Sequence, residues 1–330
     1  MMSLKSIGRL FLAAALCLAL FSPPLAAADD RIQKPAIVLA AFGTTETEAL
    51  TSILNVKKRV QAAFPGYEVH LAFTSNIIRD IWRQRADDKA FRRKNAGIPE
   101  EIYRIANPLT VLAGLQERGP RVILAQSLHV TNGEEYGDLK SAVSQLANIK
   151  TLKRRLHPFP WIGLGEPALG EGRAKDIERA AQALAPLVNE ARQKNMALVL
   201  MGHGNEHMAQ PAYRKLEKEL RKVYGPDNYI GLVEGQPDLA DILAAMNKKE
   251  RRPAGVLLAP LMVVAGDHAR NDMAGGEEDS WNTAFAQAGY QVAAHLKGLG
   301  SNDAWADIYV EHLKALEGEV LKKKAAEGEL

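Results

Sequence analysis

Short apolar runs alternate with longer amphipathic stretches along most of the chain. In the first half the apolar runs cover residues 36–42, 69–73 and 122–126, and in the second half they cover residues 197–201, 229–233 and 255–264. Uninterrupted apolar runs of this length predict strands that are buried on both faces of a parallel sheet. Helical periodicity in the intervening segments, for example residues 46–64 and 212–223, indicates strand–helix–strand units with right-handed crossovers.

The two halves repeat one plan. Their first two strands begin at nearly the same spacing, Ala36 to Val69 in one half and Ala197 to Tyr229 in the other. The pattern predicts an α/β fold of two similar domains, each a parallel sheet flanked by helices, which face each other across a cleft. Ligands bind such sheets beyond the carboxyl ends of the strands.

The expected domain boundaries follow from this pattern. We place an N-terminal α/β domain at residues 29–165 and a C-terminal α/β domain at residues 166–300. Residues 301–330 are expected to form a C-terminal helix that packs back on the first domain. A short apolar run at residues 161–164 predicts a further strand before the chain crosses between the domains.

The amino terminus has the features of a signal peptide. Lys5 and Arg9 precede an apolar run at residues 10–21, and three small residues end at Ala28. The run is short for a membrane span, so we expect cleavage of residues 1–28 and a periplasmic mature protein. An uncleaved anchor is the alternative. The single cysteine, Cys17, lies inside this segment, so the mature chain would have neither a disulfide nor a thiolate metal site.

Charge is nearly balanced over the whole chain but not along it. Lys and Arg number 42 against 39 Asp and Glu, a balance that does not favour nucleic-acid binding. One segment, residues 79–94, is strongly basic and holds Arg79, Arg83, Arg85, Lys89, Arg92, Arg93 and Lys94. It is either a solvated helical face or a rim that attracts a polyanionic substrate.

Several common chemistries are absent from the sequence. It contains no G-x-x-x-x-G-K-[ST] phosphate loop, no G-x-G-x-x-G after a strand and no G-x-S-x-G nucleophile elbow. The sequence therefore indicates neither a nucleotide cofactor nor covalent catalysis.

Two histidines follow predicted strands of the second half. His203 lies in Met201-Gly202-His203-Gly204, and His268 ends the run Val263-Val264-Ala265-Gly266-Asp267-His268. We expect both in loops at the carboxyl edge of the sheet, where neighbouring strands can bring them into one site. Imidazole is a common metal ligand and a base near neutral pH. Two unrelated loop histidines are the alternative.

Longer segments around these residues resemble a known enzyme family. In the first half they are residues 41–44, 72–75, 126–129 and 132–136, and in the second half residues 201–204 and 260–273. Together they are similar to the anaerobic sirohydrochlorin cobaltochelatases of cobalamin synthesis, within the class II chelatases. The resemblance covers nearly the whole mature chain and implies a chelatase-like fold. Two features depart from the family pattern, namely the signal peptide and extra residues near 153–173.

The resemblance implies ATP-independent insertion of Co²⁺ into sirohydrochlorin, a tetrapyrrole whose many carboxylates would give the basic segment a purpose. His203 and His268 match the family's active-site histidines. The acidic partners are Glu234, which we favour as the third metal ligand, and Glu135, which can ligate the metal or carry protons. Glu134 is the less favoured neighbour of Glu135. Ligand type alone leaves Fe²⁺, Ni²⁺ and Zn²⁺ open, and the sequence also leaves a homo-oligomer open.

The sequence leaves alternatives open for the function of the protein and for the role of His129. Export favours a periplasmic carrier or storage protein for a tetrapyrrole or metal on a chelatase scaffold. His129, which follows the strand at 122–126, either forms a hydrogen bond within its loop or contacts a tetrapyrrole, including a haem bound through its imidazole.

Overall fold

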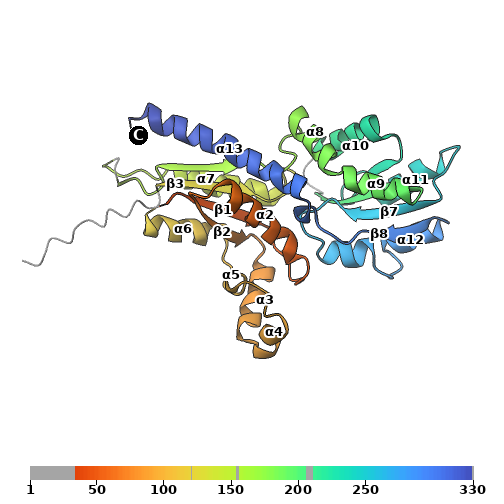
Figure 1. Cartoon of the computed structure of the whole chain (residues 1–330), viewed down its shortest axis with the longest axis horizontal. Helices are drawn as coiled ribbons and strands as arrows, with labels where there is room; N and C mark the ends of the chain where they lie inside the picture. Colours follow the sequence, from red (N-terminus) through yellow and green to blue (C-terminus); the bar gives the residue numbers. More distant parts are fainter. Residues whose placement is uncertain (1–33, 120, 154–155, 206–210, 329–330) are drawn as a thin grey trace, which may run out of the picture. The chain divides into compact units, whose positions relative to one another are not determined.

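The computed structural model describes residues 34–119, 121–153, 156–205 and 211–328 (Figure 1). The predicted signal peptide lies outside the described residues. No helix in these ranges is both long enough and apolar enough to cross a membrane.

The first half forms a four-stranded parallel sheet. Its strands are β1 (Ala36–Ala41), β2 (Glu68–Phe73), β3 (Val122–Ser127) and β4 (Trp161–Gly165), in the order β2-β1-β3-β4. Ile37 of the central strand β1 pairs with Val69 on one side and Leu124 on the other. Every residue of β1 and β3 is buried, which explains why both strands read as uninterrupted apolar runs.

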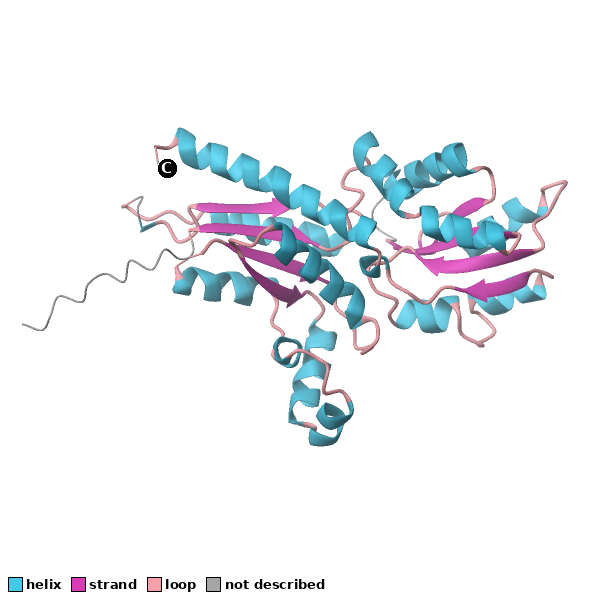
Figure 2. Ribbon diagram, in the orientation of Figure 1, coloured by secondary structure: helices cyan, strands magenta, loops and turns pink. Residues whose placement is uncertain are grey.

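The second half repeats this arrangement. Its strands are β5 (Met196–Gly204), β6 (Asn228–Glu234), β7 (Gly255–Pro260) and β8 (Gln291–Ala294), in the order β6-β5-β7-β8 with all pairs parallel (Figure 2). The predicted α/β class with two similar parallel sheets is therefore confirmed.

Helices flank both sheets. In the first half they are α2 (Leu50–Ala63), α3 (Asn76–Asp87), α4 (Lys89–Lys94), α5 (Glu100–Tyr103), α6 (Pro108–Arg118) and α7 (Glu134–Ala147). The second half has α8 (Ala174–Ala183), α9 (Ala185–Gln193), α10 (Pro211–Tyr224), α11 (Leu239–Asn247), the π-helix η2 (Ala269–Met273), α12 (Trp281–Gln287), the 3₁₀ turn η3 (Leu299–Ser301) and α13 (Asp303–Ala326). Between β2 and α6, the helices α3–α5 extend away from the first sheet (Figure 1).

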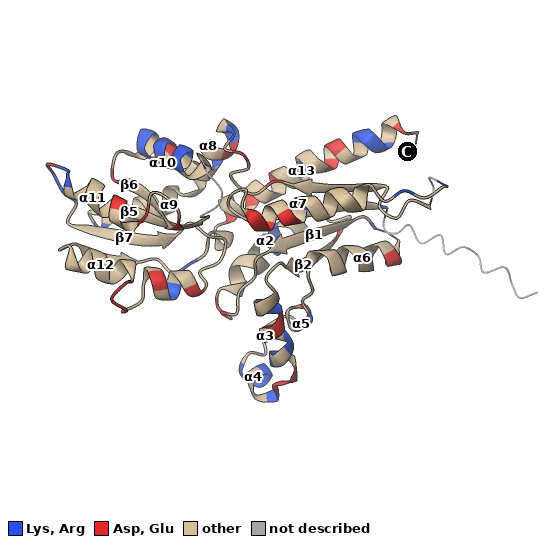
Figure 3. Ribbon diagram, turned by 180° about the vertical axis from the view of Figure 1, so that it is seen from behind, with Lys and Arg blue, Asp and Glu red and all other residues tan. Residues whose placement is uncertain are grey.

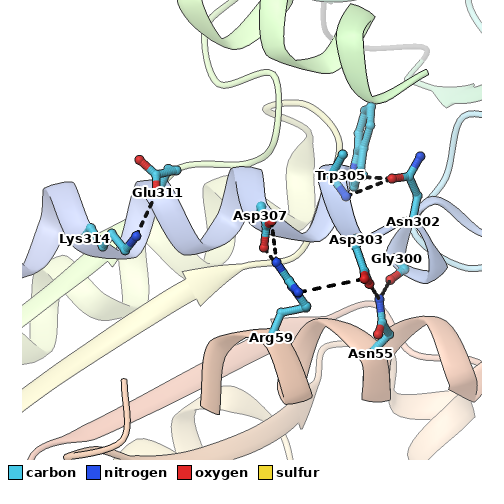
Figure 4. A network of polar contacts seen from close by, with 10 residues as sticks. Asn55, Arg59, Gly300, Asn302, Asp303, Trp305, Asp307, Glu311 and Lys314 are labelled. Atoms are coloured by element: carbon cyan, nitrogen blue, oxygen red, sulfur yellow. Dashed lines mark hydrogen bonds and ion pairs between the residues drawn. The ribbon is translucent and has the colours of Figure 1, made fainter. Parts of the chain in front are cut away.

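The long helix α13 follows the second sheet in sequence but packs on elements of the first half, namely α2, β3 and β4. Trp305 and Tyr309 are fully buried in a core cluster that includes residues from both sheets. Arg59 of α2 donates two hydrogen bonds to the Asp307 carboxylate, at 2.9 and 2.6 Å (Figure 4). Asn55 of the same helix donates to the carbonyl of Gly300 at 2.9 Å. The two halves therefore share one core, and the boundaries at 165 and 300 stay predictions.

Three local expectations from the sequence are wrong. The strand expected at 255–264 ends at Pro260. His203 does not lie in a loop, because β5 continues through Gly204. His268 lies at the amino end of the π-helix η2.

Candidate active site

The second sheet brings the two predicted histidines together. His203 is near the carboxyl end of β5, and His268 follows the neighbouring strand β7. Their ring centroids are 5.0 Å apart with the ring planes at 81°. Both side chains remain partly open to solvent, with exposed fractions of 44% for His203 and 40% for His268. The histidines therefore form one accessible site at the sheet edge.

Glu234 approaches this site from the other neighbour of β5. The parallel pairing of β5 and β6 places Gly204 opposite Glu234, and the Glu234 carboxylate oxygen Oε2 lies 3.9 Å from Nδ1 of His203. Two donor atoms that each lie about 2.1 Å from one ion are separated by roughly 3–4 Å. The separation between His203 and Glu234 is therefore suitable for sharing an ion.

The two histidines differ in the partner of Nδ1. In His203, Nδ1 lies 3.2 Å from the carbonyl oxygen of Gly204. In His268, Nδ1 contacts the carboxylate of Asp272, which is four residues further along the chain. Within the described residues, no group of three His, Cys, Asp or Glu side chains already has metal-binding geometry. The site consists of two neighbouring pairs, His203 with Glu234 and His268 with Asp272.

The residues predicted from the first half form a second group around His129. Nδ1 of His129 is 2.7 Å from the hydroxyl oxygen of Ser127. Burial lowers the pKa of His129, and the nearby charge of Glu135 opposes this shift. Lowering the pKa favours the neutral imidazole. Nε2 of His129 is buried and has no hydrogen-bond partner among the described residues.

Tyr213 of α10 links the two groups, although no motif in the sequence singles it out. It is hydrogen-bonded to the side chain of Thr131 in the first half and to the backbone of Gly204, next to His203. Burial raises the pKa of Tyr213, and the charge of Glu135 adds to that effect. Glu135 therefore lies near His129 and Tyr213 on the first-half side, whereas Glu234 lies beside His203.

The predicted basic rim is only partly available to a ligand. Arg79 is buried and donates to the carbonyls of Phe73 and Thr74. Arg85 donates to the carbonyl of Thr45 and lies over the ring of Trp82. Arg92 pairs with Glu100, and Arg83 with Asp80. Lys89, Arg93 and Lys94 on α4 are exposed, among the basic residues visible on α3 and α4 in Figure 3.

The fold and these side chains define an α/β protein with potential metal ligands at the carboxyl ends of parallel strands. A family model for cobalt chelatase (CbiK) matches residues 35–317. The chain therefore belongs to the cobalt chelatase family, which confirms the resemblance found in the sequence.

Two curated relatives agree with this assignment. Sirohydrochlorin cobaltochelatase CbiKC from Nitratidesulfovibrio vulgaris is 33% identical over 283 residues, which cover 86% of this chain and 90% of the relative. Sirohydrochlorin cobaltochelatase from Salmonella typhimurium is 32% identical over 281 residues, which cover 85% of this chain and 95% of the relative.

Solved structures also share the fold. SirB from Bacillus subtilis with Fe³⁺ has a TM-score of 0.55 at 12% identity, and the match covers 87% of this chain and 99% of SirB. The sirohydrochlorin chelatase SirB from Bacillus subtilis subspecies spizizenii in complex with cobalt has a TM-score of 0.52 at 13% identity, with the same coverage. At this identity the similarity concerns the fold alone.

Proposed function

We propose that the protein is a sirohydrochlorin cobaltochelatase, which inserts Co²⁺ into sirohydrochlorin without ATP. The observation that carries the proposal is the convergence of His203, His268 and Glu234 at the carboxyl ends of three neighbouring strands, in a chain of the cobalt chelatase family. The two curated relatives that bear this enzyme name match it over most of their own length.

The side chains suit the reaction. Co²⁺ replaces two protons on pyrrole nitrogens, so the site must deliver a divalent cation and accept two protons. Imidazole nitrogens and a carboxylate oxygen are suitable donors for Co²⁺. A neutral imidazole or a carboxylate that is not holding the ion can accept a proton near neutral pH. His203 with Glu234 would hold the ion, and His268 faces the same space.

The direct test mixes purified protein with sirohydrochlorin and Co²⁺ in the absence of nucleotide. Insertion changes the visible absorbance of the tetrapyrrole, and the rate above the uncatalysed reaction measures activity. Parallel reactions with Fe²⁺, Ni²⁺ and Zn²⁺ would define the preferred metal. A rate equal to that of the protein-free mixture with every metal would contradict the proposal.

The two acidic residues should separate metal binding from turnover. Because Glu234 lies beside His203, Glu234→Gln should weaken Co²⁺ binding, measured without tetrapyrrole, by roughly 10- to 100-fold. Glu135 lies instead near His129 and Tyr213, so Glu135→Gln should lower turnover more than Co²⁺ affinity. The opposite pattern would mean that the two glutamates have exchanged roles. Glu134→Gln, which changes the neighbouring exposed carboxylate, is the matched control.

We also propose that the enzyme is exported to the periplasm. Support comes from Lys5 and Arg9, the apolar run at 10–21 and the small residues that end at Ala28. Fractionation of cells with the full-length chain, followed by amino-terminal sequencing, tests this proposal. Export also keeps a periplasmic tetrapyrrole or metal carrier as the second candidate function, and the insertion assay separates the carrier from the enzyme.

Binding of haem at His129 would favour the carrier function. Its buried Nε2 has no hydrogen-bond partner among the described residues, while Ser127 engages Nδ1. The lowered pKa favours the neutral form that ligates iron. Because Nε2 is buried, a macrocycle can reach it only if the covering side chains move. Haem would provide redox chemistry or serve as cargo.

If His129 is a haem ligand, the purified protein should show a Soret band that His129→Ala reduces. His157→Ala is the control, because the hydrogen bonds of the His157 side chain within the described ranges are with Thr151 alone. A colourless protein, together with unchanged sirohydrochlorin affinity in His129→Ala, would leave His129 with the structural role of bonding Ser127.

A further inference from the structure

The segment that carries His268 is anchored by residues other than the histidine. Ala269 and Met273 of the π-helix η2 are fully buried in the core of the second sheet. Arg270 points to the first half, where it donates to the Glu48 carboxylate at 2.8 Å. These three residues fix the backbone on either side of position 272. Short π-helical turns often occur at functional sites.

Asp272 has a different environment from its neighbours. Its side chain is 44% exposed, and its carboxylate contacts Nδ1 of His268. It makes no other hydrogen bond or ion pair within the part of the chain that the structure describes. A carboxylate in the first turn of η2 is favoured by the helix dipole, and the one side-chain partner that Asp272 has among the described residues is His268.

The direction of this hydrogen bond fixes the chemistry of the ring. An ionised carboxylate only accepts hydrogen bonds, so Nδ1 of His268 must carry the proton. In a neutral imidazole, Nε2 then presents its lone pair. Metal-ligating histidines are commonly held in this way by a carboxylate on their other nitrogen, which fixes the ring orientation and increases its basicity.

We infer that Asp272 is a positioning residue, which holds the His268 ring so that Nε2 faces the metal ion shared with His203 and Glu234. The inference rests on the proposed function only in identifying that ion as Co²⁺. No carboxylate among the described residues lies within hydrogen-bond distance of His203 Nδ1, which is 3.2 Å from the Gly204 carbonyl oxygen and 3.9 Å from Oε2 of Glu234. The two histidines therefore have different tasks. The ring of His268 is held by a carboxylate, whereas the contact of His203 Nδ1 is with a backbone carbonyl.

The first experiment measures Co²⁺ binding to the whole protein without tetrapyrrole. Asp272→Ala should weaken binding by roughly 10- to 100-fold. Asp272→Asn should recover most of this loss, because its amide oxygen can still accept from Nδ1. Asp267→Asn is the matched control, since Asp267 is an exposed carboxylate in the same segment and contacts Asn271 instead of a histidine. Thermal unfolding of all variants checks that the fold is retained.

The second experiment observes the ring itself. Nitrogen-15 NMR of the metal-free protein should show His268 with its proton on Nδ1, and Asp272→Ala should shift it to a mixture of tautomers. Unchanged Co²⁺ affinity in Asp272→Ala, or a proton on Nε2 of His268 in the unmodified protein, would overturn the inference. Because neither measurement uses sirohydrochlorin, failure of the insertion assay would contradict the proposed function while leaving this test intact.

Discussion

Replacing either His203 or His268 by Ala should reduce the rate of cobalt insertion at least about a hundredfold, which is typical for loss of a catalytic base or ligand. The centroids of the two rings lie 5.0 Å apart. Each variant therefore removes one of the two imidazoles from the same site.

The same substitutions should leave the fold intact. Both histidine side chains are partly exposed, and surface changes of this kind typically alter the free energy of unfolding by no more than about 0.5 kcal/mol. The measurement is the insertion rate with saturating Co²⁺, combined with thermal unfolding. His157→Ala is the control for loss of an imidazole elsewhere. Near-normal turnover in either active-site variant would remove these histidines from the mechanism.

Much of the fold could be predicted because the central strands are buried on both faces. β1, β3 and β7 are buried along their whole length, so their sequences are continuous apolar runs. β8 escaped prediction because it has only four residues, none of them buried. The run at 255–264 was expected to be one strand, but β7 stops at Pro260, a residue without an N–H group for further pairing.

The sequence singled out His203 and Glu234, whose side chains lie side by side in the structure, but it did not predict the local structure around His203. Glycines on both sides of His203 suggested a loop, since glycine often marks turns. In the structure β5 continues through them. The basic segment at 79–94 shows a second limit of prediction from sequence. The sequence does not reveal that the guanidinium of Arg79 donates to the carbonyls of Phe73 and Thr74.

The sequence did not assign roles to Asp272 and Tyr213, because their contacts appear only in the folded structure. Asp272 lies inside the segment that carries the family resemblance, but only the π-helical turn shows that its carboxylate contacts Nδ1 of His268. Tyr213 looked like an ordinary buried residue of an amphipathic helix. Its contact with Thr131 depends on how the two halves pack, which no local pattern encodes.

The second large effect is expected at Gly204. This residue follows His203 in β5 and lies opposite Glu234 of β6. Gly204 has a φ of +83°, and a Cβ atom built on it would lie 1.8 Å from the carbonyl oxygen of Glu234. The left-handed backbone costs a residue other than glycine about 1–2 kcal/mol, and forcing extra volume into a packed site costs about 1–3 kcal/mol more. Gly204→Ala should therefore lower the free energy of unfolding by roughly 2–5 kcal/mol.

Gly225→Ala distinguishes the cost of the left-handed backbone from the cost of the steric clash. Gly225 has a similar φ of +88°, but a Cβ atom there would meet nothing within 4 Å, so this variant should lose only the backbone cost of about 1–2 kcal/mol. Its cobalt insertion rate should stay normal. Gly204→Ala should lose activity as well, because the alanine methyl group pushes Glu234 away from His203. Urea unfolding and the insertion assay measure both effects. Equal losses of stability in the two variants, with activity retained in Gly204→Ala, would show that the close approach of β5 and β6 is not what assembles the site.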